Sequence, residues 1–362
     1  MAKHPDRARV AWAIALIKFG ASAGVVSEPP ATSGTADATA EQYTNNASAV
    51  AHASVVRAAL AKEVDGGRLA VFDELPIFAN GPTIVSPVGV AERRFGGGIP
   101  SKFRFTHDLS RSKVNQSIAE KTASIQYIAP FDIARILQHL PPGYVGWVTD
   151  IQAAYRHVPM DPADYRRLVF FFEGKFYCET FLPFGLSTGP AIWDQLGDLI
   201  QWIVEQRTGI NMLRMLDDNF GLAPTTSMAQ QSLTIFYGTC AELGVSVQMS
   251  KTQLPATLLR FIGFMWDLAN RTVGLPEDKL ERLRFELRRL DSHTSITRSD
   301  LESITGLLNW AGFVVKHGRC FLRRFYDSIR DSGRRRGKQG EVWIRLSALL
   351  RSDLKWWASV VT

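Results

Sequence analysis

Three aspartates follow apolar segments that have the pattern of buried strands. Asp150 comes directly after Val-Gly-Trp-Val-Thr, and Asp217 and Asp218 come after the run 212–216. Strands ending at one sheet edge would bring these carboxylates together, where their repulsion is tolerable only with cations bound. Two Mg²⁺ ions held about 4 Å apart by such oxygens can drive phosphoryl transfer to a hydroxyl. The residues alone leave simpler alternatives open, because Asp-Asp-Asn is commonly a β-turn and a lone Asp is often a helix cap.

The segments that would position these aspartates alternate between predicted strands and helices. The predicted strands are 145–149, 168–172, 176–181 and 212–216, with Glu173-Gly174-Lys175 as a hairpin turn. The predicted helices are 189–206 and 227–243, followed beyond Pro276 by 277–290, 298–316 and 342–357. Trp310, Trp343, Trp356 and Trp357 are expected in the cores of these last helices. This order indicates an α+β fold in which helices back an antiparallel sheet.

Composition favours a globular protein that is not secreted. The chain has 362 residues, of which 46% are hydrophobic and 21% charged, enough for two or three subdomains. Its net charge of +7 suits a polyanionic partner, but charge alone does not separate nucleic acid binding from solubility. Three separated cysteines without a Cys-x-x-Cys pair argue against a zinc knuckle and favour a reducing intracellular compartment, cytoplasmic or nuclear. The apolar stretch 10–26 contains Lys18 and is short for a span, so we expect no membrane anchor.

The first 80 residues show no pattern that suggests chemistry. Residues 27–46 are rich in Ala, Thr, Ser and Gly and predict a linker, and 50–69 could form a helix. Between 83 and 118, the strand-like run 103–106 and the glycine cluster 96–98 predict hairpins with a mobile tip.

Three motifs change the interpretation of the aspartates. The segment Asp-Ile-Gln-Ala-Ala-Tyr-Arg-His-Val-Pro that starts at Asp150 resembles the first palm motif of reverse transcriptases. Leu-Pro-Phe-Gly-Leu-Ser at 182–187, with Gly-Pro-Ala at 189–191, resembles the second, and Leu-Asp-Asp at 216–218 resembles the third. The resemblance implies a right-hand polymerase with fingers, an antiparallel-sheet palm backed by helices, and a helical thumb or connection.

The same resemblance implies the chemistry. Asp150, Asp217 and Asp218 would be both the catalytic residues and the ligands of two Mg²⁺ ions, which Mn²⁺ could replace. The implied reaction is template-directed DNA synthesis at a primer 3′-hydroxyl. Its partners would be deoxynucleoside triphosphates and a primed RNA or DNA template, with no membrane involved.

The resemblance also assigns residues around the incoming nucleotide: Lys102, Arg104, Tyr155, Phe184, Gly185 and Lys251. Arg104 matches the arginine that grips the triphosphate, a task suited to a planar multidentate donor. Tyr155 matches a ring beneath the sugar that rejects ribonucleotides, with Phe184 and Gly185 as the floor of that pocket. Lys251 matches a lysine near the leaving group. The residues alone leave open an edge-strand charge for Arg104, a core position for Tyr155 and a solvated loop for Lys251.

The implied primer and template residues are Met215, Phe261, Gly263, Arg288 and Arg289. Phe261 and Gly263 belong to Phe-Ile-Gly-Phe, which resembles the hairpin that grips the primer, although a buried strand would look the same. Basic residues after Pro276, including the run 334–336, could follow nucleic acid phosphates. Glycines around that run equally predict a solvated loop. Met215 departs from the family, which usually has an aromatic residue at this position.

The implied domains are an N-terminal extension (1–80), fingers and palm (81–275), and a helical thumb or connection (276–362). The last of these would precede a ribonuclease H domain, although no acidic set of that kind follows Trp357.

The downstream segments also suggest a subgroup. Segments 275–280, 301–311 and 318–324 resemble the DIRS-like retrotransposons more than the gypsy-like elements that share the second motif. Two hypotheses follow. The chain is either an active RNA-directed DNA polymerase from a retroelement polyprotein, or a decayed or domesticated remnant that only binds nucleic acid. The oligomeric state is not predicted.

Overall fold

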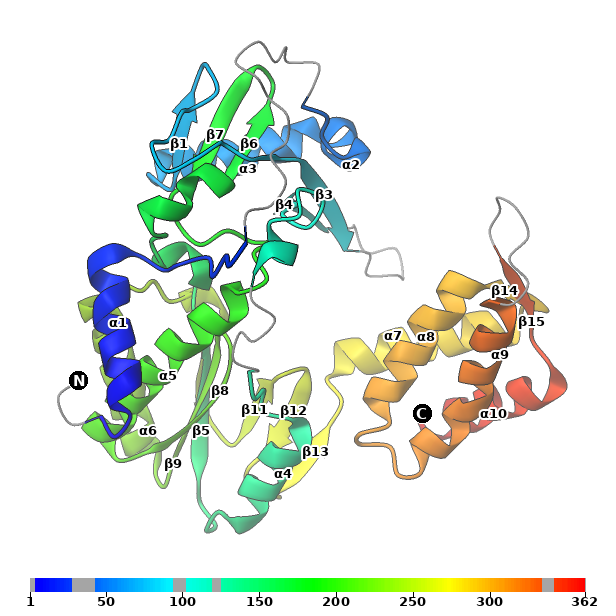
Figure 1. Cartoon of the computed structure of the whole chain (residues 1–362). Helices are drawn as coiled ribbons and strands as arrows, with labels where there is room; N and C mark the ends of the chain where they lie inside the picture. Colours follow the sequence, from blue (N-terminus) through cyan, green and yellow to red (C-terminus); the bar gives the residue numbers. More distant parts are fainter. Residues whose placement is uncertain (1–3, 28–42, 94–101, 119–124, 334–341, 362) are drawn as a thin grey trace. The chain divides into compact units, whose positions relative to one another are not determined.

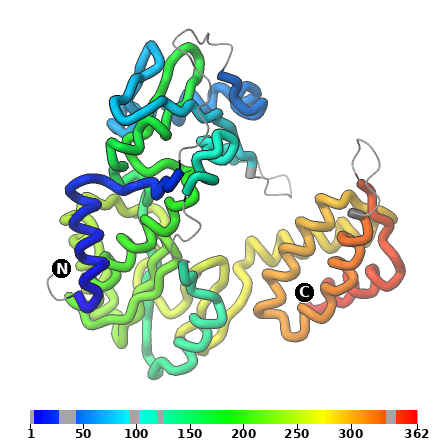
Figure 2. Tube along the Cα trace, viewed as in Figure 1, coloured from blue at the N-terminus to red at the C-terminus, as the bar shows by residue number. Residues whose placement is uncertain are grey.

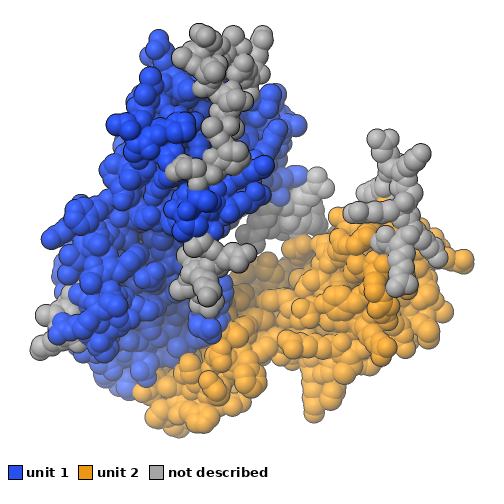
Figure 3. Space-filling view, viewed as in Figure 1, with its two compact units in different colours: residues 1–94, 100–128, 145–256 blue, residues 95–99, 129–144, 257–362 orange. Residues whose placement is uncertain are grey.

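The computed structural model describes residues 4–27, 43–93, 102–118, 125–333 and 342–361. These residues form two compact units (Figure 3). The first comprises the described residues up to 128 together with 145–256, and the second comprises 129–144 and the described residues from 257 onward. The predicted glycine tip 96–98, the basic run 334–336 and most of the predicted linker 27–46 lie outside the described residues.

A four-stranded antiparallel sheet in the first unit has the order β10, β5, β9, β8 (Figure 1). Its strands are β5 (Val145–Asp150), β8 (Asn211–Met215), β9 (Asp218–Ala223) and β10 (Gln253–Ala256). Strand β5 is buried along its whole length, as its unbroken apolar run predicts. In the register of this sheet, Asp150 pairs with Asp218 from one side and Met215 pairs with Asp218 from the other.

Helices α5 (Gly189–Thr208) and α6 (Thr226–Glu242) pack with this sheet. Helix α5 has proline in its first turn and ends at Gly209, whose left-handed backbone (φ 69°) only glycine adopts readily. Trp147 of β5 is fully buried, and a Cβ at Gly221 of β9 would overlap its indole ring. Its Nε1 donates to Ser232 Oγ of α6 at 2.9 Å, so the sheet and this helix form one core. The strands and helices predicted between 145 and 243 are confirmed to within two residues at each end.

A second sheet in the same unit has the order β1, β7, β6, β2. Its strands are β1 (Leu69–Phe72), β7 (Lys175–Glu179), β6 (Val169–Phe172) and β2 (Val85–Ser86). The predicted hairpin 168–181 is its β6–β7 pair, and β2 joins β6 in parallel. Strands β3 (Val88–Arg93) and β4 (Lys102–His107) form a separate antiparallel hairpin, which packs with helices α2 (Ala47–Ala51) and α3 (Ala53–Asp65). The helix predicted over 50–69 is confirmed over 53–65 and wrong at its ends: His52 separates α2 from α3, and Leu69 begins a strand.

The N-terminal segment runs beside α5 in both chain traces (Figures 1 and 2). Helix α1 (Arg7–Phe19), which we did not predict, buries Val10, Ala13 and Leu16. Its N-cap is Asp6, whose carboxylate accepts from the backbone N–H of Arg9. Among the described residues, no helix is long and apolar enough to cross a membrane.

The second unit contains a three-stranded sheet and a group of helices. The sheet is formed by β11 (Leu258–Phe261), β12 (Phe264–Asp267) and β13 (Thr272–Gly274). The helices are α4 (Pro130–His139), α7 (Glu277–Asp291), α8 (Arg298–Ala311), α9 (Arg323–Gly333) and α10 (Ala348–Val360), and strands β14 (Ser295–Thr297) and β15 (Trp343–Arg345) pair with each other. Leucines from α7, α8 and α10 surround the fully buried Trp357.

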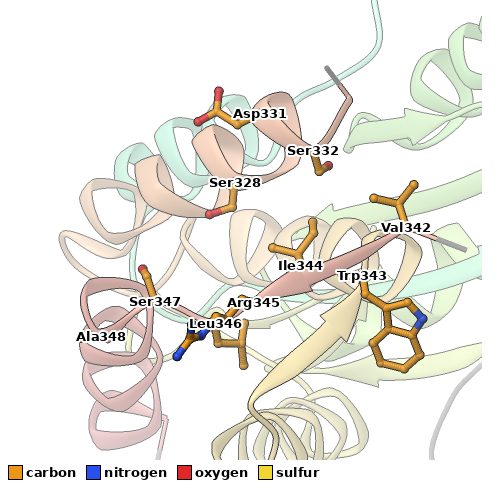
Figure 4. Close-up of a pocket in the computed structure, with 10 residues that line it drawn as sticks. All are labelled: Ser328, Asp331, Ser332, Val342, Trp343, Ile344, Arg345, Leu346, Ser347 and Ala348. Atoms are coloured by element: carbon orange, nitrogen blue, oxygen red, sulfur yellow. The ribbon is translucent and has the colours of Figure 1, made fainter. Parts of the chain in front are cut away.

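Two predictions for this unit are wrong in part. The helix predicted over 298–316 ends at Ala311, and the helix predicted over 342–357 begins as strand β15 and becomes helical only at Ala348. Trp343 is consequently 61% exposed on an edge strand instead of lying in a helix core, whereas Trp357 is buried as predicted. A shallow pocket lies between the end of α9 and β15, lined by Ser328, Asp331, Ile344 and Trp343 among others (Figure 4).

Candidate active site

The three aspartates lie at one edge of the β10–β5–β9–β8 sheet. Asp217 lies in the turn between β8 and β9, Asp218 begins β9, and Asp150 ends β5 as the register partner of Asp218. The backbone of the turn is fixed: Ile151 N–H donates to the Asp217 carbonyl at 2.9 Å, and so does the Asn219 amide at 2.9 Å. Leu216, immediately before the two aspartates, has a left-handed backbone (φ 53°) that is costly for a residue other than glycine.

The carboxylates raise one another's proton affinity. Burial and the neighbouring Asp150 raise the pKa of Asp217, and burial, Asp217 and Asp150 raise the pKa of Asp218 to about 6. Asp150 is 6% exposed, and its Oδ1 is buried without a hydrogen-bond donor among the described residues. The carboxyls of Asp150 and Asp217 come within hydrogen-bonding reach, but neither can donate while both are ionised. The site therefore holds more negative charge than its surroundings compensate.

Lys251 balances part of this negative charge. Lys251 Nζ forms an ion pair with Asp150 Oδ2, and that hydrogen bond raises the pKa of the lysine. The side chain of Lys251 is otherwise 66% exposed, on the short 3₁₀ helix Met249–Lys251. The segment is attached to the site by its backbone as well, since Gln248 N–H donates to the Asp150 carbonyl at 2.7 Å. The structure thus places Lys251 at the aspartates, not in a detached loop.

Two aromatic rings lie next to the aspartates. Tyr155 stacks on Phe184 with ring centroids 5.2 Å apart and planes 30° apart. Tyr155 is half-buried, and burial, Tyr127 and Asp217 raise its pKa to about 12, so its hydroxyl stays protonated. Phe184 is 46% exposed, and the Arg156 guanidinium lies over its ring, 5.6 Å from the centroid. Tyr155 also packs against the hydrophobic core. The alternative interpretation of Tyr155 as a core residue is therefore correct for one side of the ring, while the ring also stacks on Phe184.

The turn that carries Phe184 is held against the end of β4. Gly185 has φ 115°, and a Cβ there would lie less than 3.0 Å from the His107 carbonyl oxygen, so the position requires glycine. Asn115 clamps the same turn: its Nδ2 donates to the Gly185 carbonyl at 2.8 Å, and its Oδ1 accepts from Ser187 N–H at 2.9 Å. Asn115 is not among the site residues predicted from the sequence.

The two predicted basic residues of the fingers lie on β4. Lys102 and Arg104 are exposed there, and Arg104 pairs in register with Ala91 of β3. Arg104 forms no hydrogen bond or ion pair with another described residue. The structure does not bring Arg104 into contact with the aspartates, so its predicted role depends on a bound nucleotide.

The predicted primer and template residues are divided between the units. Met215 is half-buried beside Asp218 in the first unit. In the second unit Phe261 is 1% exposed, as a buried strand would have it, and Gly263 (φ 88°) forms the tight β11–β12 turn against Trp310. On α7, the guanidinium of Arg289 is paired with Glu286 at 2.8 Å and Asp300 at 3.6 Å, and Arg288 Nε donates to a backbone carbonyl. Their contacts with nucleic acid stay predictions.

Comparison with known sequences identifies part of the chain. Residues 102–266 match the family model of the reverse transcriptase (RNA-dependent DNA polymerase). The chain is 27% identical over 177 residues to the Pro-Pol polyprotein of feline foamy virus, a match covering 49% of this chain and 14% of that protein. It is 22% identical over 208 residues to Protein P of duck hepatitis B virus, covering 56% of this chain and 26% of that protein. The chain thus spans a small part of these relatives.

Solved structures show the same fold. A foamy viral protease-reverse transcriptase in complex with double-stranded DNA matches with a TM-score of 0.65 and 18% identity, over 98% of this chain and 57% of that one. A foamy viral protease-reverse transcriptase in complex with an RNA/DNA hybrid matches with a TM-score of 0.64 and 19% identity, over 88% of this chain and 37% of that one. The predicted α+β polymerase fold is confirmed. The match of residues 102–266 to the reverse transcriptase family model agrees with this fold.

Proposed function

We propose that this chain catalyses template-directed DNA synthesis, extending a primer 3′-hydroxyl with deoxynucleotides on an RNA or DNA template. The observation that carries the proposal is the cluster of Asp150, Asp217 and Asp218 at one sheet edge of a reverse transcriptase domain. Three adjacent carboxylates, of which Asp217 and Asp218 have raised pKa values, cost stability, and divalent cations bound to them would offset that cost.

The donor set fits two Mg²⁺ ions, with Mn²⁺ as a substitute. Asp150 would contribute to both ions, because its Oδ1 is buried without a donor, while Asp217 and Asp218 complete the oxygen ligands. When bound, the ions would activate the primer hydroxyl and neutralise the triphosphate. No three acidic, histidine or cysteine side chains in the described part of the chain lie close enough to hold an ion as they stand. Ion binding would therefore require Lys251 to release Asp150 and the three carboxylates to turn toward one another.

The other site residues then have distinct tasks. Lys251, released from Asp150 and largely exposed, can turn to the leaving phosphates and donate a proton or a hydrogen bond. The stacked pair of Tyr155 and Phe184 would contact the sugar and exclude a ribose 2′-hydroxyl. Lys102 and Arg104 would grip the triphosphate from the β3–β4 hairpin.

The wider context of the chain is also a proposal. The foamy viral structures with double-stranded DNA and RNA/DNA hybrid support nucleic acid as the partner. The polyprotein relative supports a piece of a retroelement polyprotein, and the segments after Pro276 support a retrotransposon of the DIRS-like or gypsy-like group. Intracellular synthesis in the cytoplasm or nucleus follows from this context.

A second candidate function is a decayed or domesticated remnant that binds nucleic acid without catalysis. The observation that favours it is Met215, which stands beside Asp218 where the family usually has an aromatic residue. Because methionine is flexible and apolar, it can still pack beneath a primer end, so this change alone does not remove the chemistry.

Primer extension separates the two functions. We would assay the chain on primed RNA and DNA templates with Mg²⁺ or Mn²⁺, together with Asp217→Asn and the control Asp73→Asn. Asp73 is suitable because its carboxylate is 87% exposed. The proposal expects incorporation by the wild type and the control, and its loss in Asp217→Asn. Template binding without incorporation by the wild type would favour the remnant and contradict the polymerase.

A further inference from the structure

Arg214 is a buried arginine that reaches the backbone of the catalytic turn. It lies on β8, with 6% of its side chain exposed, two residues before Leu216. Its Nη1 donates to the Leu216 carbonyl at 3.1 Å. Leu216 is the left-handed residue that directs the chain into Asp217 and Asp218, so this bond fixes the turn at its most strained point.

The guanidinium is itself anchored to α5. Its Nη2 donates to the Asp194 carboxylate at 2.8 Å and to the Asp194 carbonyl at 3.0 Å, and it also pairs with Asp198. These two acids are four residues apart and therefore lie on one face of the helix. Between them, a Cβ at Gly197 would lie 2.7 Å from Arg214 Nη1, so α5 has glycine where the guanidinium passes. The contact is built by several residues.

The anchor extends into the N-terminal segment. Asp198 accepts a hydrogen bond from Arg214 at Oδ1 and another from Arg9 of α1 at Oδ2. The segment around Arg9 is held on both sides: His4 packs edge-on against Trp202 of α5 at 4.7 Å, and the Ala23 carbonyl accepts from the Thr188 hydroxyl at 3.2 Å. Arg9 is thus connected to the Leu216 carbonyl through two side chains.

The contacts indicate that Arg214 acts through geometry. Its donors are directed at α5 and at the Leu216 carbonyl. We propose that Arg214 is a positioning residue for the Asp217–Asp218 turn and that Arg9 orients it through Asp198. The N-terminal helix α1 is then part of the support of the metal site. This inference rests on the proposed function only in taking the aspartates as metal ligands.

The test compares Arg9→Ala with Arg9→Lys and with Arg7→Ala in the full chain. Arg7 is a matched control, since it is exposed in the first turn of the same helix and has no partner among the described residues. Residues that orient metal ligands typically change affinity by roughly tenfold or more. Because Arg9 acts at one remove, we expect Arg9→Ala to weaken Mn²⁺ binding roughly three- to tenfold. Arg7→Ala should leave it unchanged, and Arg9→Lys should restore most of the loss.

Mn²⁺ binding is measured by electron paramagnetic resonance of the free ion, and the half-saturating Mg²⁺ concentration by primer extension. Thermal denaturation reports stability separately. A lower melting temperature for Arg9→Ala with unchanged Mn²⁺ affinity would overturn the inference, because it would make the contact merely structural. The inference would also be overturned if Arg9→Ala weakened Mn²⁺ binding as much in an Asp198→Asn variant as in the wild type, because the effect would then not pass through Asp198. If the wild type binds Mn²⁺ in an Arg9-dependent way but incorporates no nucleotide, the proposed function fails and this inference stands.

Discussion

Removing one of the three clustered carboxylates should stabilise the protein in the absence of metal ions. The pKa of Asp218 is raised from its ordinary 3.8 to about 6, by burial first and then by Asp217 and Asp150. A difference of about two units corresponds to about 3 kcal/mol of unfolding free energy at neutral pH, at roughly 1.4 kcal/mol per unit. Because the carboxylate is partly accessible and its neighbours can relax, we expect Asp218→Asn to stabilise by about 1–3 kcal/mol.

The sign of this effect sets its pH dependence. The folded state binds the Asp218 proton more tightly than the unfolded state, so the wild type loses stability as pH rises from about 4 to about 6. Asparagine does not titrate. The gain in Asp218→Asn should therefore vanish near pH 4 and reach its full value above pH 7.

Urea denaturation in EDTA between pH 4.5 and 8 measures both quantities. The control is Asp73→Asn, whose ion pair with Lys175 is largely exposed and should be worth less than about 1 kcal/mol. Adding Mg²⁺ should stabilise the wild type and have little effect on Asp218→Asn. If Asp218→Asn were less stable than the wild type in EDTA at pH 7.5, repulsion among the buried carboxylates would not destabilise the wild type, and the reasoning would be refuted. A gain in stability that does not depend on pH would show that it does not arise from the titration of Asp218.

Three further predictions test the surroundings of the site. Gly185→Ala places a Cβ less than 3.0 Å from a β4 carbonyl, whereas the Cβ of Gly174→Ala (φ 81°) meets no atom within 4 Å. The positive φ costs both variants about 1 kcal/mol of stability. A larger loss of melting temperature in Gly185→Ala than in Gly174→Ala therefore measures the steric clash. Tyr155→Val opens the stacked pocket, and ribonucleotide incorporation relative to deoxynucleotide should rise roughly tenfold or more in single-nucleotide extension; an unchanged ratio would remove Tyr155 from sugar selection. Glu179→Ala leaves the Arg156 guanidinium buried without its closest carboxylate and should cost about 3–5 kcal/mol in urea denaturation, while a cost below about 1 kcal/mol would mean that Glu63 takes over the pair.

The aspartates could be predicted because their chemistry restricts both residue type and surroundings. An acidic residue at the end of a largely apolar strand is visible in a sequence, and both Asp150 and Asp217 have that context, although Arg214 interrupts the run before Asp217. Asn115 could not be found in this way, because the two bonds by which it holds the Phe184 turn reach residues 70 and 72 positions away. An asparagine in a turn satisfies many local roles, and nothing near it in sequence indicates which one it has.

The errors in the second unit have a different cause. Residues Val342 to Leu346 alternate in burial, with Ile344 and Leu346 inside and Trp343 and Arg345 outside. That period of two predicts a strand, but we extended the following helical pattern backward across it. Helix α1 was missed because its sequence has no clear helical period. Its apolar residues are spread around the helix, and only Val10, Ala13 and Leu16 are buried.

The turn between β8 and β9 differs from the β6–β7 turn in what holds it. Glu173 (φ 47°) also has a left-handed backbone, but it is followed by Gly174, whose Cβ position is open, so solvent and the turn itself determine its shape. Leu216 lacks a following glycine and has an arginine bonded to its carbonyl instead. A strained residue persists when its surroundings hold it, and here those surroundings are α5 and, through Asp198, α1. A substitution that touches no carboxylate can therefore alter metal binding, and the N-terminal helix is where such a substitution would be least expected from sequence.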